Sequence, residues 1–432
     1  MTRLIKTLIM RKLLFLLYIS VLNIFITNAQ VNQVPTIKRC ATAELLAKRK
    51  AADPSLEQRL IDEENKLQQW ISQNANYKTE STITIPVVVH VVYKTAVQNI
   101  SDAQIHSQID VLNEDYGRKN QDTANTPTPW KSIAGNPDIK FCLASRKPNG
   151  DWTTGIVRKQ TTVTEFFLDD AVKYSNQGGD DAWDVTKYFN IWVCNIPSVL
   201  GYAFYASISP PNDGFGPVIY YNAFGRVGTV SPPYDKGRTA THETGHCFDL
   251  VHIWGDDGGA CSGTDYVNDT PNQESENYVC QTFPFTDACT STGNGIMFMN
   301  YLDYAPDVCM NMFTKGQATR MVGAINSYYP SLKTSNGCQP PSSIQEGLLD
   351  QSVSFYPNPT DGKLNININS LYASDLQINI YNVVGEIIAS NKVEHFNSGT
   401  LKMDLSAQPN GLYFVKVTDQ SESIIKQIMI SR

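Results

Sequence analysis

Three of the six histidines in this chain lie in one short segment, THETGHCFDLVHIWGD at 241–256. His242 and His246 are four residues apart, so on an α-helix their side chains lie on the same face and can bind one metal ion. His252 comes six residues after His246, which requires the helix to end and the chain to turn back between them. Three neutral imidazole nitrogens with one open position are typical of a catalytic zinc site rather than a structural one.

Glu243 directly follows the first of these histidines. It is badly placed to be a fourth ligand, but it can accept a proton from a water molecule on the open side of the site. Zinc lowers the pKa of water toward ~7 and polarises a carbonyl group, so the pattern predicts metal-dependent hydrolysis. The alternative is an accidental motif on a solvated helix face, which the third histidine at this spacing disfavours.

The histidine pattern resembles the long zinc signature of the metzincin metalloproteases. The following Trp254-Gly255-Asp256 is similar to the pappalysin and cytophagalysin branch of that group. A second segment, GIMFMNYLDYAPDVCMNMFTKGQ at 295–317, resembles the methionine turn of the same branch. The resemblance covers residues 82–330 and implies a secreted zinc endopeptidase that acts on protein or peptide substrates.

The resemblance assigns two roles within the second segment. It implies that Met299 lies in the turn beneath the metal. It also implies that Tyr301, two residues further on, approaches the zinc and donates a hydrogen bond to the oxyanion of the tetrahedral intermediate. The alternatives are that Met299 is an ordinary core residue and that Tyr301 is an ordinary packing residue.

The zinc signature departs from the family pattern at Asp249, where relatives have glycine. That glycine allows a tight, left-handed exit from the helix, and aspartate tolerates positive φ at a cost of ~1 kcal/mol. We interpret Asp249 as tolerated strain, because His252 is retained; Asp249 as a ligand in place of His252 is a remote alternative. The departure also motivates a second function class, a catalytically weak surface binding or adhesion protein built on a protease fold.

Cys40 stands apart from the other cysteines, in the sequence Lys38-Arg39-Cys40. A thiolate is a strong zinc ligand, so Cys40 could fill the open position and keep the enzyme latent. Related enzymes carry a similar cysteine in a removable propeptide, usually followed by glycine, whereas Ala41 follows here. Cleavage between 71 and 83 would then activate the enzyme. The alternative is an idle or disulfide-bonded thiol.

The chain has nine cysteines, so at least one has no partner within the chain. Four of them cluster in the loop-rich stretch at 255–310, and the sequence alone allows three pairings among those four. The family resemblance implies the pairs Cys261–Cys289 and Cys280–Cys309. Cys247 is expected in the core; Cys142, Cys194 and Cys338 are left undetermined.

The loop GDDGGACSGTDYVNDTPNQE at 255–274 is crowded with oxygen donors. Asp265, Asp269 and nearby carbonyl groups could hold calcium, which prefers hard oxygen ligands, and relatives bind calcium in this region. The alternative is a polar, turn-rich loop without a metal ion.

Two features bear on the substrate. The segment LGYAFYAS at 200–207 could supply an edge strand that pairs with the substrate backbone, or it could be a simple sheet strand. Some relatives prefer Arg or Lys just after the cleaved bond and use an acidic pocket floor. By that resemblance, Asp307 is a candidate for a specificity pocket, and the alternative is a surface carboxylate.

Strands and helices that could position these residues are visible in the sequence. TITIPVVVHVVY at 82–93 and KYFNIWVCNI at 187–196 are strand-like, and helices are predicted at 101–116, after a Ser101 cap, and at 237–251. The predicted fold is therefore an α+β metzincin-like catalytic domain, with a twisted sheet and an active-site helix, followed by a C-terminal all-β sandwich.

The last 82 residues alternate apolar and polar positions between turns, which favours a small β-sandwich. The segments SFYPNPTDGKLNI, YNVVGEII and NGLYFVKV resemble the C-terminal sorting domain of the type IX secretion system of Bacteroidota. That resemblance implies the type IX secretion machinery as a partner and export across both membranes of a Gram-negative envelope. The alternative is a generic carbohydrate-binding or adhesion module.

The predicted organisation has five parts. They are a signal peptide at 1–29, a helical propeptide at 30–81, the zinc metalloprotease domain at 82–332, a linker at 333–350 and the sorting domain at 351–432. The apolar run within the signal peptide is short and cleavable, so no transmembrane segment is expected after its removal. A net charge of −7 disfavours a nucleic-acid partner, because such a partner requires a basic surface.

Overall fold

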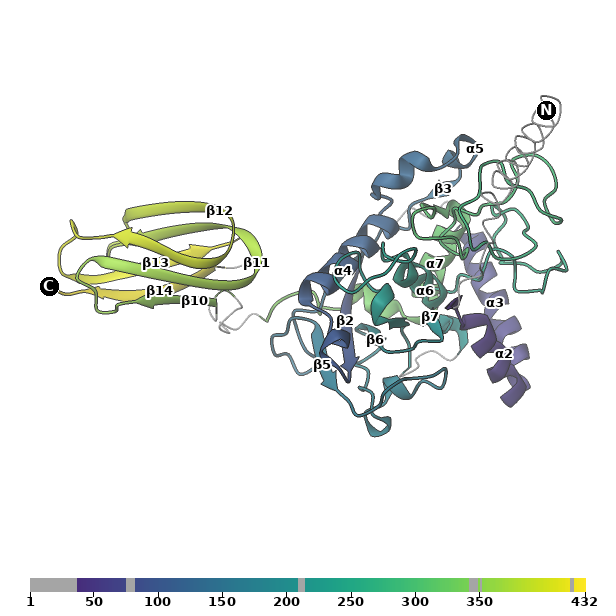
Figure 1. Cartoon of the computed structure of the whole chain (residues 1–432), viewed down its shortest axis with the longest axis horizontal. Helices are drawn as coiled ribbons and strands as arrows, with labels where there is room; N and C mark the ends of the chain where they lie inside the picture. The colour runs from purple at the N-terminus through teal and green to yellow at the C-terminus, as the bar shows by residue number, and fades with distance from the viewer. Residues whose placement is uncertain (1–36, 75–81, 209–213, 342–348, 350–351, 420–422) are drawn as a thin grey trace, which may run out of the picture.

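The computed structural model describes residues 37–74, 82–208, 214–341, 349, 352–419 and 423–432 (Figure 1). The signal peptide predicted at 1–29 lies outside these residues. Among the described residues, no helix has the length and apolar character needed to cross a membrane.

A seven-stranded sheet forms the centre of the catalytic region. Its order is β1-β7-β8-β6-β2-β4, and β5 also pairs with β2. The central strand β2 pairs in parallel with β4, β5 and β6, which explains its nearly continuous apolar sequence. The strands are β1 (Lys38–Cys40), β2 (Ile83–Tyr93), β4 (Ile139–Leu143), β5 (Ile156–Gln160), β6 (Phe189–Cys194), β7 (Val199–Tyr202) and β8 (Val218–Tyr220).

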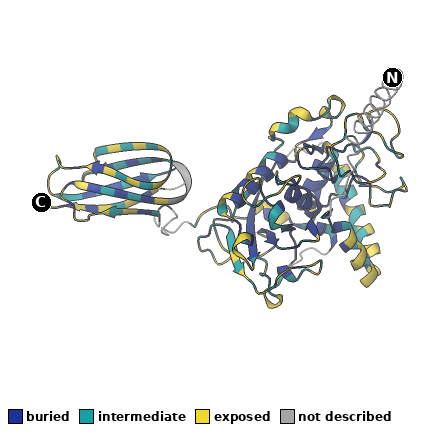
Figure 2. Cartoon of the chain, in the orientation of Figure 1, coloured by how far each residue is buried: buried dark blue, intermediate teal, exposed yellow. Residues whose placement is uncertain are grey.

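Among the described residues of the catalytic region, three helices have ten or more residues. Helix α4 (Asp102–Tyr116) begins after Ser101, whose side chain accepts a hydrogen bond from the Gln104 amide, as the sequence predicted. Helix α6 (Arg238–Cys247) is buried along its whole length, at the centre of the region in Figure 2. Helix α7 (Lys315–Tyr328) begins with a capping box. The short elements α5 (Thr128–Lys131), β3 (Ala134–Gly135) and β9 (Phe313–Thr314) lie at one end.

The N-terminal segment forms two helices, α2 (Thr42–Ala52) and α3 (Ser55–Gln73), and Pro54 lies directly before the second. Helix α3 packs on α7, where a side chain added at Gly323 would come within 2.8 Å of Trp70. Nearby, Arg320 of α7 makes two hydrogen bonds to Glu64 of α3, at 2.8 and 2.7 Å. The N-terminal helices therefore have no core of their own and depend on the catalytic region.

The C-terminal unit is all β. It contains β10 (Val353–Tyr356), β11 (Lys363–Tyr381), β12 (Ile387–Asp404), β13 (Gly411–Thr418) and β14 (Ser423–Ile430). The first part of β11 pairs with β10 and the second part with β13, while β12 follows β11 along both parts. The two long strands therefore continue through two layers of strands, which enclose an apolar core.

The sequence left open a disulfide that the structure contains, Cys142–Cys338. It joins β4 to a residue 196 positions later. Close by, the Gly337 carbonyl accepts a hydrogen bond from the Ser145 amide. The start predicted for the linker, residue 333, is therefore wrong, because the chain stays bound to the catalytic sheet through Cys338.

We expect loss of this disulfide to destabilise the catalytic region. Removing a native disulfide from a secreted domain costs about 2–5 kcal/mol, because the unfolded chain regains a long, unconstrained loop. The double variant Cys142→Ser/Cys338→Ser should therefore melt well below the wild type in calorimetry. Cys194→Ala, which removes a buried free thiol, is the control for disturbing the core. Equal melting temperatures for the double variant and the wild type would contradict this expectation.

Candidate metal centre

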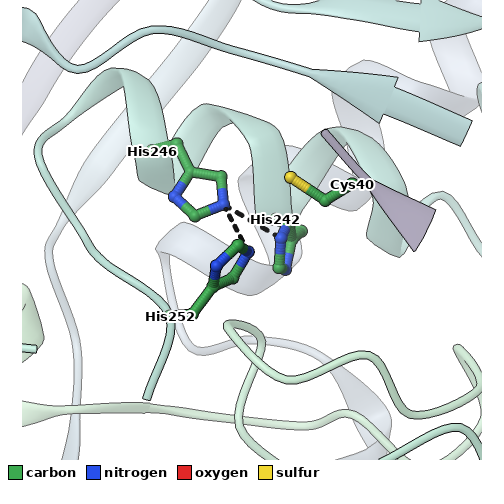
Figure 3. A group of neighbouring side chains, drawn as sticks. All are labelled: Cys40, His242, His246 and His252. Carbon is green, nitrogen blue, oxygen red and sulfur yellow. Dashed lines mark hydrogen bonds between the residues drawn. The ribbon is translucent and has the colours of Figure 1, made fainter. Parts of the chain in front are cut away.

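Helix α6 presents His242 and His246 from the centre of the core. Both imidazoles are completely buried, and their Nε2 atoms lie 3.0 Å apart. The Nε2 atom of His252 lies 3.1 Å from that of His246. Figure 3 shows the three rings converging on one point. The structure thus brings together the three histidines that the sequence predicted.

Each ring is oriented through its other nitrogen. The Nδ1 atom of His242 donates to the Tyr301 carbonyl, that of His246 donates to the Leu250 carbonyl, and that of His252 donates to the Asp256 carboxylate, each at 2.7 Å. These oxygens accept the Nδ1 hydrogens, so the Nε2 lone pairs face the shared point. Burial lowers the pKa of His242 and His246 well below the usual range, which keeps both rings neutral. The arrangement fits zinc.

Cys40 completes a group of four around the same point. Its Sγ atom and one nitrogen from each histidine all lie within 4.8 Å of one another. This is the one group of three or more His, Cys, Asp or Glu residues around a common point among the residues that the structure describes. Three imidazoles and one thiolate would fill the four positions of a tetrahedral zinc site if they bound zinc together.

Glu243 lies beside this group and is also completely buried. Its Oε2 atom accepts hydrogen bonds from Cys40 Sγ at 3.4 Å and from Thr42 Oγ1 at 3.2 Å. Burial raises its pKa to about 8. A side chain at Gly201 of β7 would come within 2.9 Å of Glu243 Cγ, so the glycine makes room for the carboxylate.

The helix exit depends on Asp249, which has φ of +65°. Its Oδ1 atom accepts hydrogen bonds from the Ser207 amide and hydroxyl, and its carbonyl accepts one from Arg320 Nε at 2.6 Å. Asp249 therefore adopts the left-handed conformation expected at this position. The chain turns back and delivers His252, and Asp249 does not belong to the ligand group.

The prediction that the Tyr301 side chain faces the metal is wrong for this structure. The Tyr301 hydroxyl hydrogen-bonds Asp115 and Arg238, each at 3.0 Å. The physical reason is a buried ion pair between Arg238 of α6 and Asp115 of α4, which attracts the phenol away from the histidines. Tyr301 serves the site through its carbonyl group instead, and Met299 is buried in the surrounding core.

The Tyr304 ring, which the sequence reasoning missed, lies against two of the three histidines. Its ring centroid lies 5.1 Å from that of His252 and 5.7 Å from that of His242. Its hydroxyl donates to the Cys40 carbonyl at 3.2 Å. Tyr304 is in the same segment as Met299 and Tyr301.

Asp307 is completely buried, so the alternative of a surface carboxylate is wrong. Its Oδ1 atom accepts a hydrogen bond from Arg39 Nη2 at 2.9 Å, and its Oδ2 atom accepts from the Lys236 and Arg238 amides. Arg39 is also completely buried and donates to the Ala305 carbonyl at 2.8 Å. A charged side chain of the N-terminal segment, next in sequence to Cys40, thus pairs with Asp307 inside the core.

The N-terminal segment also covers strand β7, which lies against Glu243 and is called here the rim of the site. Strand β1 pairs in parallel with β7, which sets Lys38 opposite Val199 and Cys40 opposite Gly201. On its other side β7 pairs with β8. Without β1, therefore, β7 would be an edge strand, as expected of a strand that binds an extended peptide.

The loop-rich stretch contains the two disulfides that the family resemblance implied, Cys261–Cys289 and Cys280–Cys309. Both Asp265 oxygens accept hydrogen bonds within the loop, from the Val267 amide and the Thr270 hydroxyl. Asp269 Oδ2 accepts one from the Gly316 amide, whereas its Oδ1 atom is buried without a partner in the described part of the chain. The structure does not bring Asp265 and Asp269 into a group of three carboxylates.

Two families match parts of this chain. Residues 173–326 match the peptidase family described as pregnancy-associated plasma protein-A, and residues 354–431 match the secretion system C-terminal sorting domain. An extracellular metalloprotease of Colletotrichum graminicola is 30% identical over 311 residues, which are 68% of this chain and 95% of that protein. One of Arthroderma benhamiae is 31% identical over 248 residues, 55% of this chain and 76% of that protein.

Solved structures are similar over the same region. Promirolysin of Tannerella forsythia, determined as a point mutant, is 47% identical with a TM-score of 0.66, over 71% of this chain and all of that one. Mature mirolysin of the same organism, in complex with a cleaved peptide, is 52% identical with a TM-score of 0.59, over 61% of this chain and all of that one.

These similarities agree with the converging histidines and with the mixed sheet. They support a metallo-endopeptidase that is secreted or exported to the cell surface, and nothing in them supports a binding or adhesion protein without activity. The chain belongs to the pappalysin family of metzincin zinc metalloproteases and carries a type IX secretion sorting domain.

Proposed function

We propose that His242, His246 and His252 hold the catalytic zinc ion of this endopeptidase and that Glu243 is its general base. The convergence of three buried Nε2 atoms, each ring oriented by an acceptor on Nδ1, is the observation that carries this proposal. A zinc ion bound there polarises the scissile carbonyl group and increases the acidity of water. Glu243 accepts the proton from the attacking water and later donates it to the leaving amine.

We expect metal removal to abolish cleavage and zinc to restore it. The test uses the full chain after proteolytic removal of the N-terminal segment, with casein as substrate. Dialysis against a zinc chelator should bring cleavage to background, and added zinc, but not magnesium, should recover it. Circular dichroism before and after dialysis controls for unfolding. Protein shown to be metal-free by elemental analysis that still cleaves casein would contradict the proposal.

We also propose that residues 30–81 are a removable propeptide and that Cys40 keeps the zymogen latent. Cys40 Sγ lies in the ligand group, and the Cys40 and Thr42 side chains both bind the Glu243 carboxylate. Strand β1 covers β7 at the same time. One short segment thus blocks the metal site, the general base and the peptide-binding strand at the same time. Removal of that segment would free all three together.

We propose that Asp307 is the floor of a specificity pocket for Arg or Lys just after the cleaved bond. The support is its present occupant: Arg39 directly precedes the residue that blocks the metal and pairs with Asp307 inside the core. A buried carboxylate that already pairs with a guanidinium group is suited to a basic substrate side chain.

Asp307→Asn should remove this preference in the mature enzyme. Loss of one partner from a desolvated charge pair costs at least ~2 kcal/mol, which is about 30-fold in relative rate. The measurement is the ratio of kcat/KM for a peptide with arginine after the scissile bond to that for the same peptide with neutral citrulline. The exposed Asp151→Asn is the matched control. An unchanged ratio in Asp307→Asn would contradict the assignment.

The remaining proposals concern calcium and the domain boundaries. A calcium site that includes Asp265 and Asp269 stays a prediction, supported by the buried, unpartnered oxygen of Asp269.

We propose a catalytic domain that extends from residue 82 through Cys338, with a shorter linker after it. The sorting domain begins at 351, and the type IX secretion machinery would bind it.

A further inference from the structure

The N-terminal segment places a second arginine on the catalytic region, at a site distant from Asp307. Arg49 of α2 donates to the Asp170 carboxylate, with Nη2 at 3.0 Å from Oδ2. Its guanidinium carbon lies 3.6 Å from the centroid of the Phe204 ring. A carboxylate beside an aromatic face is a recognition site for a planar cation. We refer to Asp170 and Phe204 together as the Asp170–Phe204 notch.

The notch is formed by the catalytic region itself. Lys173 is buried and donates to the Gly214 and Gly216 carbonyls at 2.6 and 3.1 Å. Its Nζ atom also lies 3.2 Å from Asp170 Oδ1 and 4.9 Å from the Phe204 ring centroid. Lys173 therefore forms an ion pair with one oxygen of Asp170, and the other, Oδ2, accepts the hydrogen bond from Arg49. Asp170, Lys173 and Phe204 all belong to the catalytic region.

The two arginine sites lie on either side of the metal centre along the rim. Strand β1 runs parallel to β7, with Cys40 opposite Gly201, and the next contact along the rim is from Thr42 to the Ala203 amide. Arg39 precedes Cys40 and enters the Asp307 pocket, whereas Arg49 follows Cys40 and reaches Phe204. The Asp307 pocket and the notch are therefore separated by the blocked metal centre.

We propose that the Asp170–Phe204 notch is a second subsite of the mature enzyme and binds a basic side chain that precedes the scissile bond. The proposal rests on the proposed role of Asp307, because a substrate with its residue after the bond in that pocket crosses the metal toward Phe204. Removal of Arg49 frees Asp170 Oδ2 and the Phe204 face together. The propeptide fills both subsites with arginine side chains. The mature enzyme therefore favours substrates that have basic residues both before and after the scissile bond.

The experiment uses the full chain with a site-specific cleavage sequence inserted at 75–81, so that the propeptide can be cut on demand. Its first measurement is propeptide release after cutting, followed by size-exclusion chromatography. Arg49→Ala and Asp170→Asn should each speed release about 5-fold, and their combination no further, because both remove the same contact. The exposed neighbour Asp169→Asn is the matched control and should release at the wild-type rate. Release of Asp170→Asn at the wild-type rate would overturn the pairing.

The second measurement uses peptides that share arginine after the scissile bond and carry either arginine or citrulline at one of the positions before it. The wild type and Asp169→Asn should prefer arginine about 5-fold in kcat/KM at one such position, and Asp170→Asn should lose that preference. A wild type without preference at any of these positions, or a preference that persists in Asp170→Asn, would overturn the subsite. Failure of the proposed function has another signature: no peptide is cleaved, while the release measurement still responds to Asp170→Asn.

Discussion

Glu243→Gln should lower peptide-bond cleavage by about 10²–10⁴-fold, the range that positioned general bases contribute. Glutamine keeps the size of the side chain, so Gly201 still accommodates it. It cannot accept the proton from water, whereas the three histidines and their Nδ1 partners are untouched. The loss should therefore appear in kcat, with zinc content and melting temperature close to those of the wild type.

The measurement compares kcat and KM for one arginine-containing peptide in cut, propeptide-free enzyme. Glu165→Gln, an exposed residue away from the metal centre, is the matched control and should keep full activity. A zinc-loaded Glu243→Gln enzyme within tenfold of wild-type kcat would show that another group takes the proton. That result would refute the assigned base but leave the zinc ligands in place, so it separates the two parts of the proposal.

The parts of the site that were predictable from the sequence depend on local geometry. His242 and His246 lie together because any α-helix places residues four apart on one face. The return of His252 requires one left-handed residue, and aspartate is among the residue types that accept this conformation, so Asp249 at +65° follows from its position in the motif.

The parts that were not predictable depend on partners from distant elements. The Tyr301 hydroxyl hydrogen-bonds Arg238 and Asp115. These two residues meet only because α6 packs against α4. The pairing of Cys142 with Cys338 joins residues 196 positions apart. Asp307 could not be told from a surface carboxylate until Arg39 was seen inside the core beside it. In each case the residue type was visible, but its surroundings were determined by the tertiary fold.

The pairing of propeptide and catalytic region also accounts for two buried charges that would otherwise be costly. Arg39 and Asp307 are both completely buried, and they form an ion pair at 2.9 Å. Breaking a buried pair by removing one partner costs about 3–5 kcal/mol, because the other charge remains without compensation. With the proposed roles, the mature enzyme would avoid that cost because Asp307 would face solvent, and a basic substrate side chain would restore the pair. Latency and specificity would then depend on the same carboxylate.

Cys40→Ala should convert the zymogen into an enzyme that cuts itself. Loss of the Cys40 side chain removes one member of the group of four and also its 3.4 Å contact with the Glu243 carboxylate. We expect self-processing to rise at least ~100-fold, which corresponds to ~2.7 kcal/mol of lost ligand interaction. Arg39→Ala should have a similar effect by a different route, because it leaves Asp307 buried and unpaired and weakens the hold of β1 on β7.

The measurement is the time course of conversion on gels, with N-terminal sequencing of the product to locate the cut. Lys38→Ala is the matched control, since Lys38 lies in the same strand but pairs only with the exposed Glu44, and it should stay as latent as the wild type. Conversion of Cys40→Ala must disappear when Glu243→Ala is added, because otherwise a contaminating protease does the cutting. A Cys40→Ala zymogen that stays intact and inactive while zinc is bound would mean that covering the rim is sufficient for latency. The thiolate would then have no inhibitory role, and the segment from β1 through α3 would act by steric exclusion alone.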